Sequence, residues 1–168
     1  MRSFLLFLLS LVFFIPLSHG QKPVAIEAAA LFRGKHPETV SLFNTATSAK
    51  ENLRQYVDQA YSLTLRPDVL SQINSTGPNL FRLQLPSPFN IALDLYRVDI
   101  FSASARIKTS DGSTLPPNPE NKFYRGIING NQNSLAIVSI FKNKIQILYA
   151  DENGNHRITT SFSESAVS

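Results

Sequence analysis

The stretch from Tyr124 to Ile158 constrains the fold of this chain more than any other part of it. It contains three short apolar runs rich in Ile and Val, which are separated by polar residues that readily form turns. This alternation is typical of consecutive β-hairpins, and the two Asn-Gly pairs inside it argue against a helix. We therefore predict an antiparallel meander. Its runs are Phe123–Ile128, Leu135–Phe141 and Ile145–Ala150, and its turns are Asn129-Gly130-Asn131, Lys142-Asn143-Lys144 and Asp151–Asn155.

Leu135–Phe141 is almost continuously apolar, which predicts a central strand covered on both faces. Further strands are predicted upstream, where apolar and polar residues alternate over Leu80–Leu85 and Ile91–Val98 and more weakly over Ser104–Thr109. The proline-rich residues 115–119 cannot pair within a central sheet, so we expect this connector at the sheet edge.

Helices are expected only in the N-terminal half. Ser48 and Glu51 form a capping-box pattern that predicts a helix over residues 48–60. Pro67 at a first-turn position, followed by apolar residues to Ile73, predicts a second short helix that ends before Asn74, after a strand that opens at 61–65. Residues 21–37 fit a short strand or a helix fragment equally well.

These patterns together predict an α+β domain. Its main part is an antiparallel sheet of about seven strands with the meander at its C-terminal end, and one or two short helices cover one face of the sheet. The expected organisation is a leader over 1–20, a poorly defined segment over 21–40, a β-rich domain over 41–158 and a flexible tail over 159–168.

The first 20 residues have the features of a secretory signal peptide. Arg2 supplies the positive charge, an apolar run of about 14 residues follows, and small residues precede a cut between Gly20 and Gln21. That run is short against the roughly 20 residues that a bilayer core requires, which disfavours a retained anchor. We expect a secreted protein, extracellular or periplasmic, with no stable membrane anchor.

Charge and cysteine content narrow the function further. Removal of Arg2 with the leader leaves 15 basic residues against 12 acidic ones, and the basic residues are scattered singly, so no nucleic-acid partner is expected. The chain has no cysteine, which excludes disulfides, a thiolate nucleophile and a cysteine-rich zinc site.

Catalytic and metal-binding patterns are also missing from the sequence. Beyond the leader the only histidines are His36 and His156, and there is no H-E-x-x-H, G-x-S-x-G or phosphate-binding glycine loop. Asp151–Asn155 offers oxygen ligands near a glycine, but that glycine comes too early for a calcium-binding loop, so a hairpin turn is predicted. Asp94 and Asp99, five residues apart, would lie on opposite faces of a strand and do not form a catalytic carboxylate pair. No cofactor or metal is predicted.

One modification site is predicted. Asn74-Ser75-Thr76 is the sole N-glycosylation sequon, and it falls in a predicted loop of an exported chain.

Several segments resemble the N-terminal propeptide region of secreted zinc metallopeptidases of the reprolysin, or adamalysin, family. In such propeptides a Tyr-x-Gly strand leads through a polar turn to a Ser-led apolar strand. The resemblance covers about residues 40–158. It is carried by Leu83–Pro86 before the strand Ile91–Ile100, then by Tyr124-Arg125-Gly126 with Gly130, by Asn133-Ser134-Leu135-Ala136 and by Ser139-Ile140-Phe141.

The resemblance implies a folding and latency module for a zinc protease domain. The chain departs from the family pattern because it lacks the cysteine that some relatives use to occupy the zinc, and Lys142-Asn143-Lys144 replaces a turn that often contains glycine. The sequence ends at Ser168 before any H-E-x-x-H motif, so we expect a truncated product or a stand-alone module without catalytic activity.

Three hypotheses follow. The first is a noncatalytic metallopeptidase propeptide-like domain, whose partner would be a zinc metallopeptidase catalytic domain or another secreted protein. The alternative is an independent secreted domain that binds a protein or a glycan. The third is an enzyme whose hydrolytic site uses His156, Asp151 and a serine such as Ser139.

Overall fold

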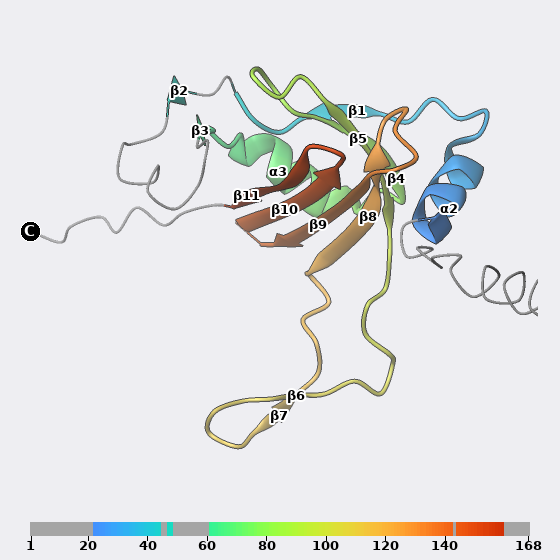
Figure 1. Cartoon of the computed structure of the whole chain (residues 1–168). Helices are drawn as coiled ribbons and strands as arrows, with labels where there is room; N and C mark the ends of the chain where they lie inside the picture. The colour runs from blue at the N-terminus through green and yellow to red at the C-terminus, as the bar shows by residue number, and fades with distance from the viewer. Residues whose placement is uncertain (1–21, 45–46, 49–60, 143, 160–168) are drawn as a thin grey trace, which may run out of the picture.

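A computed structural model describes residues 22–44, 47–48, 61–142 and 144–159 (Figure 1). These residues form two helices, a seven-stranded sheet and two small two-stranded sheets. The order in the large sheet is β1-β4-β5-β8-β9-β10-β11, in which only β1 and β4 are parallel neighbours. The predicted α+β class with a mainly antiparallel sheet is confirmed. The elements are α2 (Lys22–Phe32), β1 (Thr39–Ser41), β2 (Thr47–Ser48), β3 (Tyr61–Ser62), α3 (Pro67–Thr76), β4 (Leu80–Gln84), β5 (Ala92–Arg97), β6 (Ile107–Lys108), β7 (Thr114–Leu115), β8 (Lys122–Ile128), β9 (Leu135–Phe141), β10 (Lys144–Asp151) and β11 (Gly154–Thr159).

Helix α3 begins where the sequence predicts it and ends three residues later. Pro67 starts it, because the proline ring presets a helical φ and needs no hydrogen-bond partner in the first turn. Gly77 ends it in the left-handed conformation, at φ 52°, and its amide donates to the Ile73 carbonyl over 2.9 Å. The prediction that the helix stops before Asn74 was wrong because Gly77 is the residue that adopts this conformation.

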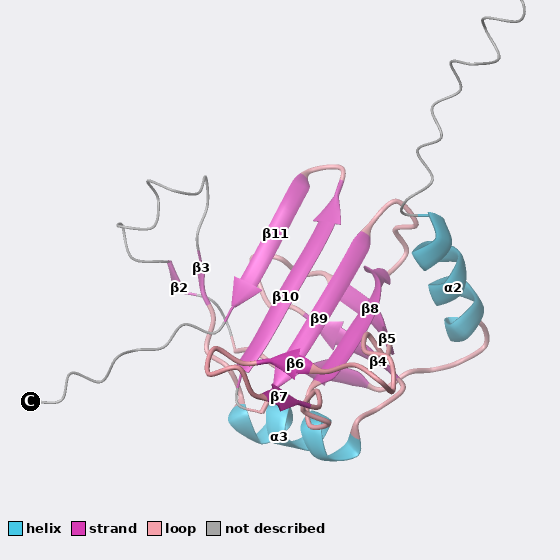
Figure 2. Cartoon of the chain, turned by 90° about the horizontal axis from the view of Figure 1, so that it is seen from below, coloured by secondary structure: helices cyan, strands magenta, loops and turns pink. Residues whose placement is uncertain are grey.

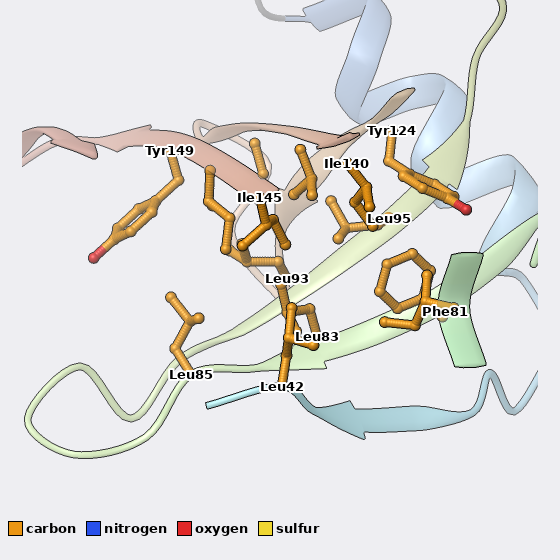
Figure 3. Close-up of a cluster of buried hydrophobic side chains, with 14 of the residues drawn as sticks. Leu42, Phe81, Leu83, Leu85, Leu93, Leu95, Tyr124, Ile140, Ile145 and Tyr149 are labelled. Carbon is orange, nitrogen blue, oxygen red and sulfur yellow. The ribbon is translucent and has the colours of Figure 1, made fainter. Parts of the chain in front are cut away.

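The core lies on the inner face of the sheet, defined as the face that packs against α3. The sheet curls around this helix (Figure 1), and Leu70 and Ile73 of α3 join the buried side chains of the strands. Figure 3 shows part of this cluster. Its fully buried members include Leu42, Phe81, Leu83, Leu85, Leu93, Leu95, Tyr124, Val138, Ile140, Ile145 and Ile147.

Helix α2 packs on the opposite, outer face. Ala25 and Ala28 are buried there against Tyr96 of β5 and Ile127 of β8. Residues 22–32 are therefore a helix, which resolves the ambiguity of the N-terminal segment. Of the two helices predicted to share one face, α3 is described, and it lies on the inner face. The predicted helix 48–60 lies outside the described residues apart from Ser48, which belongs to β2.

Strand β9 is covered on one face only, contrary to the prediction. Ala136, Val138 and Ile140 are buried on the inner face, whereas Ile137 points outward and is 40% exposed. In the order of the sheet the middle strand is β8, with three strands on each side. The continuous apolar run of β9 thus supplies an exposed apolar surface as well as core.

A projecting arm, residues 99–121, connects β5 to β8. Figure 1 shows that it extends well away from the sheet, and its strands β6 and β7 pair only with each other. The predicted strand over Ser104–Thr109 shrinks to Ile107–Lys108. The proline-rich connector lies outside the large sheet, as predicted, but it returns to the middle strand β8 and does not run along an edge. Nowhere in the described residues is there a helix of the length and apolarity needed to cross a bilayer.

Candidate functional site

Tyr124 and Gly126, the first residues of the motif on which the predicted family resemblance rests, hold the middle of the sheet together. Tyr124 is fully buried, and its ring meets Phe81 edge to face at 5.0 Å between centroids. Gly126 lies opposite Leu95 of β5, and a Cβ atom there would overlap the carbonyl oxygen of Asp94. Only glycine fits this close approach of two strands.

Gly130 and Ser134 shape the turn between β8 and β9. Gly130 adopts φ +80°, which favours glycine. Ser134 is completely buried; its Oγ accepts a hydrogen bond from the Ile128 amide over 2.8 Å and donates one to the Asn131 carbonyl over 2.7 Å. The serine thereby closes the turn, which makes its role structural. Ser139, the last motif residue, lies on β9 opposite Gln146.

Asp94 lies at the centre of a polar network that sequence reasoning missed. Arg82 of β4 binds it with two donors, Nε to Oδ1 over 2.6 Å and a terminal nitrogen to Oδ2 over 3.1 Å. Asn129 adds a third bond, from Nδ2 to Oδ2 over 2.7 Å. The Asp94 hydrogen bond raises the pKa of Arg82. Arg82 and Asp94 lie opposite each other on two strands that the sequence predicts, and this arrangement is the sequence signal that could have indicated their ion pair.

A second network attaches α2 to the outer face. Arg125 donates to Glu27 over 2.6 Å and to the Tyr96 hydroxyl over 2.7 Å, and this hydroxyl donates to Glu27 over 2.8 Å. The guanidinium also lies over the Tyr96 ring, 5.4 Å from its centroid. Burial, with a smaller contribution from Glu27, raises the pKa of Tyr96 to about 12. The network stays in its neutral-tyrosine form at physiological pH.

The residues of the hydrolytic hypothesis do not come together. His156 Nε2 lies 3.7 Å from an Asp151 carboxylate oxygen, and the imidazole stacks on Tyr149 at 4.5 Å between ring centroids. His156 pairs with Tyr149 on the inner side of the sheet, whereas Ser139 alternates with inward-facing Val138 and Ile140 and so points outward. Opposite faces of a sheet cannot supply one nucleophile and its base.

The turns at one end of the sheet form an open hollow. It is lined by Asn129, Gly130, Asn131, Asn133, Asp151 and Glu152, and Asn131 donates to Glu152 over 3.1 Å. Asp151 accepts a hydrogen bond from the Asn153 amide over 2.8 Å. This is the bonding of an Asx turn, and it agrees with the predicted hairpin turn. The part of the chain that the structure describes contains no group of three or more His, Asp or Glu side chains placed to bind a metal ion.

Asn74, the predicted glycosylation site, lies in the last turn of α3 and not in a loop. Its Nδ2 donates to the Lys142 carbonyl over 2.6 Å, and its Oδ1 is buried. The nitrogen that would carry a glycan therefore ties α3 to the turn between β9 and β10. The predicted cleavage residues Gly20 and Gln21 lie outside the described residues.

The outer face of β8–β11 carries a row of four side chains across the four strands. The register places Arg125 opposite Ile137, Ile137 opposite Leu148 and Leu148 opposite Arg157. Ile137 and Leu148 are 40% and 44% exposed. In Figure 2, which views the sheet from below, no described helix covers these strands and α2 stands beside β8.

An aromatic strip extends this apolar surface towards the projecting arm. Phe101 meets Phe123 edge to face at 5.8 Å, and Phe123 meets Phe141 at 5.9 Å between centroids. We call Phe101, Phe123, Ile137, Phe141 and Leu148 the outer patch.

Comparison of the chain with protein-family models, with curated proteins and with solved structures finds no match.

Proposed function

We propose that this chain is a noncatalytic secreted domain of the metallopeptidase-propeptide type. It assists the folding of a reprolysin-type zinc protease domain, or docks on that domain and keeps it latent. It reaches the extracellular or periplasmic space after cleavage between Gly20 and Gln21. Its own residues perform no proteolysis.

One observation carries this proposal. The residues that resemble the family, Tyr124, Gly126, Gly130 and Ser134, all have structural tasks within one continuous meander. Residues shared for reasons of chemistry would instead gather around a reactive centre, with a nucleophile or base in reach of a substrate. A motif that specifies a fold fits a domain whose work is binding.

The outer patch, which no described helix covers, supports the same proposal. Apolar side chains that stay exposed in a folded domain are the common mark of a surface that binds another protein. A latency module needs such a surface because it acts only by contact.

The test is refolding of a reprolysin-type zinc protease domain. The domain is diluted from denaturant with an equimolar amount of this chain or of serum albumin. We expect a higher yield of folded protease with the chain, and reduced peptide hydrolysis while both are present. Equal yields and equal hydrolysis in the two samples would refute the proposal.

A second candidate function is binding of a glycan by the open hollow at the turn end of the sheet. The hollow presents amide and carboxylate groups of Asn129, Asn131, Asn133, Asp151 and Glu152, which can hydrogen-bond sugar hydroxyls. Calorimetric titration with oligosaccharides, repeated with Asn133→Ala, separates the two candidates. Heat of binding that the wild-type chain shows and Asn133→Ala lacks would support glycan binding. Absence of binding heat with the wild-type chain would exclude it.

A further inference from the structure

The row Arg125, Ile137, Leu148 and Arg157 contains two arginines that flank an apolar pair, and only one of them is matched within the described residues. Glu27 of α2 binds Arg125 over 2.6 Å, while apolar side chains of the same helix cover the sheet beside it. Arg157 is exposed at the other end of the row. Adjacent strands are about 4.8 Å apart, so the two arginines are separated by roughly 14 Å.

The charged side chains that point outward from β8–β11 are all basic. The outward residues of β8–β11 include Arg125, Lys144 and Arg157, and no described residue that points outward from these four strands is acidic. Because Arg125 already binds Glu27, the charge of this row that a complementary surface should match is that of Arg157, beside the apolar pair. Arg157 is suited to bind a carboxylate, because a guanidinium can hold a carboxylate with two parallel hydrogen bonds.

We propose that the outer patch and Arg157 bind an acidic-rimmed apolar surface of the partner protease domain. Its apolar side chains cover Ile137 and Leu148, and a carboxylate binds Arg157 in the way that Glu27 of α2 binds Arg125. The identity of the partner rests on the proposed function; the location and chemistry of the surface come from the row itself.

The shape of the region favours a protein over other occupants. The projecting arm extends beyond the sheet at one end of the outer patch, and α2 stands at its side (Figures 1 and 2). A flat bilayer would meet the polar tip of the arm, Thr109–Ser113, before it reached Ile137. A second copy would place the same basic residues against each other in a two-fold interface. A partner with a convex acidic and apolar surface fits the corner between sheet and arm.

The experiment measures the dissociation constant between this chain and a reprolysin-type zinc protease domain, by surface plasmon resonance. Leu148→Ser and Ile137→Ser test the apolar pair, and Arg157→Glu tests the charge. Ile26→Ser is the matched apolar control, since Ile26 is 68% exposed on α2. Lys35→Glu is the charge control, because Lys35 is exposed before β1 and this variant changes the net charge as Arg157→Glu does. Melting curves verify that each variant is folded.

We expect about tenfold weaker binding for each of the three outer-face variants and less than a twofold change for both controls. Binding should also weaken as salt rises, and less steeply for Arg157→Ala than for the wild type. Wild-type affinity in all three outer-face variants would overturn the proposed surface while leaving the proposed function standing. Absence of binding by the wild-type chain would overturn both.

Two further measurements exclude the other occupants. The chain is sedimented with vesicles of phosphatidylcholine and phosphatidylserine, and alone at increasing concentration. We expect a monomer that does not pellet with vesicles. Vesicle binding or a dimer that Leu148→Ser abolishes would assign the outer patch to a membrane or to a second copy, and would overturn the inference.

Discussion

The carbonyl oxygen of Asp94 occupies the space into which a side chain on Gly126 would project. The two residues lie on β5 and β8, next to each other at the centre of the sheet. A methyl group at position 126 would collide with backbone, which cannot rotate away as a flexible side chain can. The two strands would have to separate.

Gly126→Ala should therefore destabilise the domain by about 3 kcal/mol, the upper part of the range for an overpacked core. Gly34→Ala is the control, since Gly34 has φ +67° with open space around it and should cost about 1 kcal/mol. Urea unfolding of both variants measures the difference. Equal losses would show that the sheet does not need its close approach at Gly126.

Removal of Arg82 should have a comparable effect for an electrostatic reason. Asp94 is 6% exposed and receives two of its three hydrogen bonds from Arg82, so Arg82→Leu leaves a buried carboxylate with Asn129 as its remaining partner. We expect a loss of about 3 kcal/mol. The double variant Arg82→Leu with Asp94→Leu should recover most of it, because no buried charge then remains. A double variant as unstable as the single one would contradict this account.

Two tyrosines should respond in opposite directions to loss of their hydroxyl groups. The Tyr124 hydroxyl is buried without a hydrogen-bond partner in the described structure, whereas that of Tyr96 bonds to Glu27 and Arg125. Tyr124→Phe should be neutral or should stabilise by about 1 kcal/mol, and Tyr96→Phe should destabilise by about the same amount. Thermal and urea unfolding compare the pair. The same sign for both variants would refute the assignment of partners.

Stability should fall at alkaline pH because burial raises the pKa of three tyrosines, Tyr96, Tyr124 and Tyr149. Tyr96 and Tyr149 both have a pKa of about 12, against about 10 in an unfolded chain. Burial is the main cause in each, and the nearby Asp151 adds to it for Tyr149. The neutral phenol is favoured in the folded state, so its contribution is complete below pH 10 and is lost as the pH rises through 12.

The free energy of unfolding should thus drop by on the order of 2 kcal/mol per tyrosine between pH 9 and 12. Tyr149→Phe should make the decline shallower. Absorbance at 295 nm gives an independent check, since Tyr96, Tyr124 and Tyr149, three of the five tyrosines, should ionise late. Ionisation of all five near pH 10 in the folded protein would be incompatible with this explanation.

Much of the fold was predictable because its strands carry their own local signals. Alternating residues in β4 and β5 and turn residues in the meander determine which side chains point inward, and the structure confirms these elements. The sheet has seven strands, as predicted, but the predicted strands at 61–65 and 104–109 lie outside it and β1 takes part in it. The parallel pairing of β1 with β4 was not predictable, since the three residues Thr39–Ser41 carry no pattern and their partner is far along the chain.

Coverage of the sheet faces could not be deduced from apolar runs. Leu135–Phe141 has apolar residues on both faces, and the sequence does not distinguish a strand buried on both faces from one that leaves Ile137 exposed. The position of α2 on the outer face could not be predicted for the same reason, because an alanine-rich helix fits either face of the sheet. The networks around Asp94 and Arg125 were missed because they join residues from three elements each.

Amide hydrogen exchange of this chain, with and without a reprolysin-type protease domain as the proposed partner, tests the central proposal most directly. We expect slower exchange upon complex formation in the projecting arm and in β9 and β10 beneath the outer patch, with the turn residues 129–133 and 151–155 unchanged. Protection confined to those turns, or no protection at any amide, would contradict a domain that docks on a protease through its outer face.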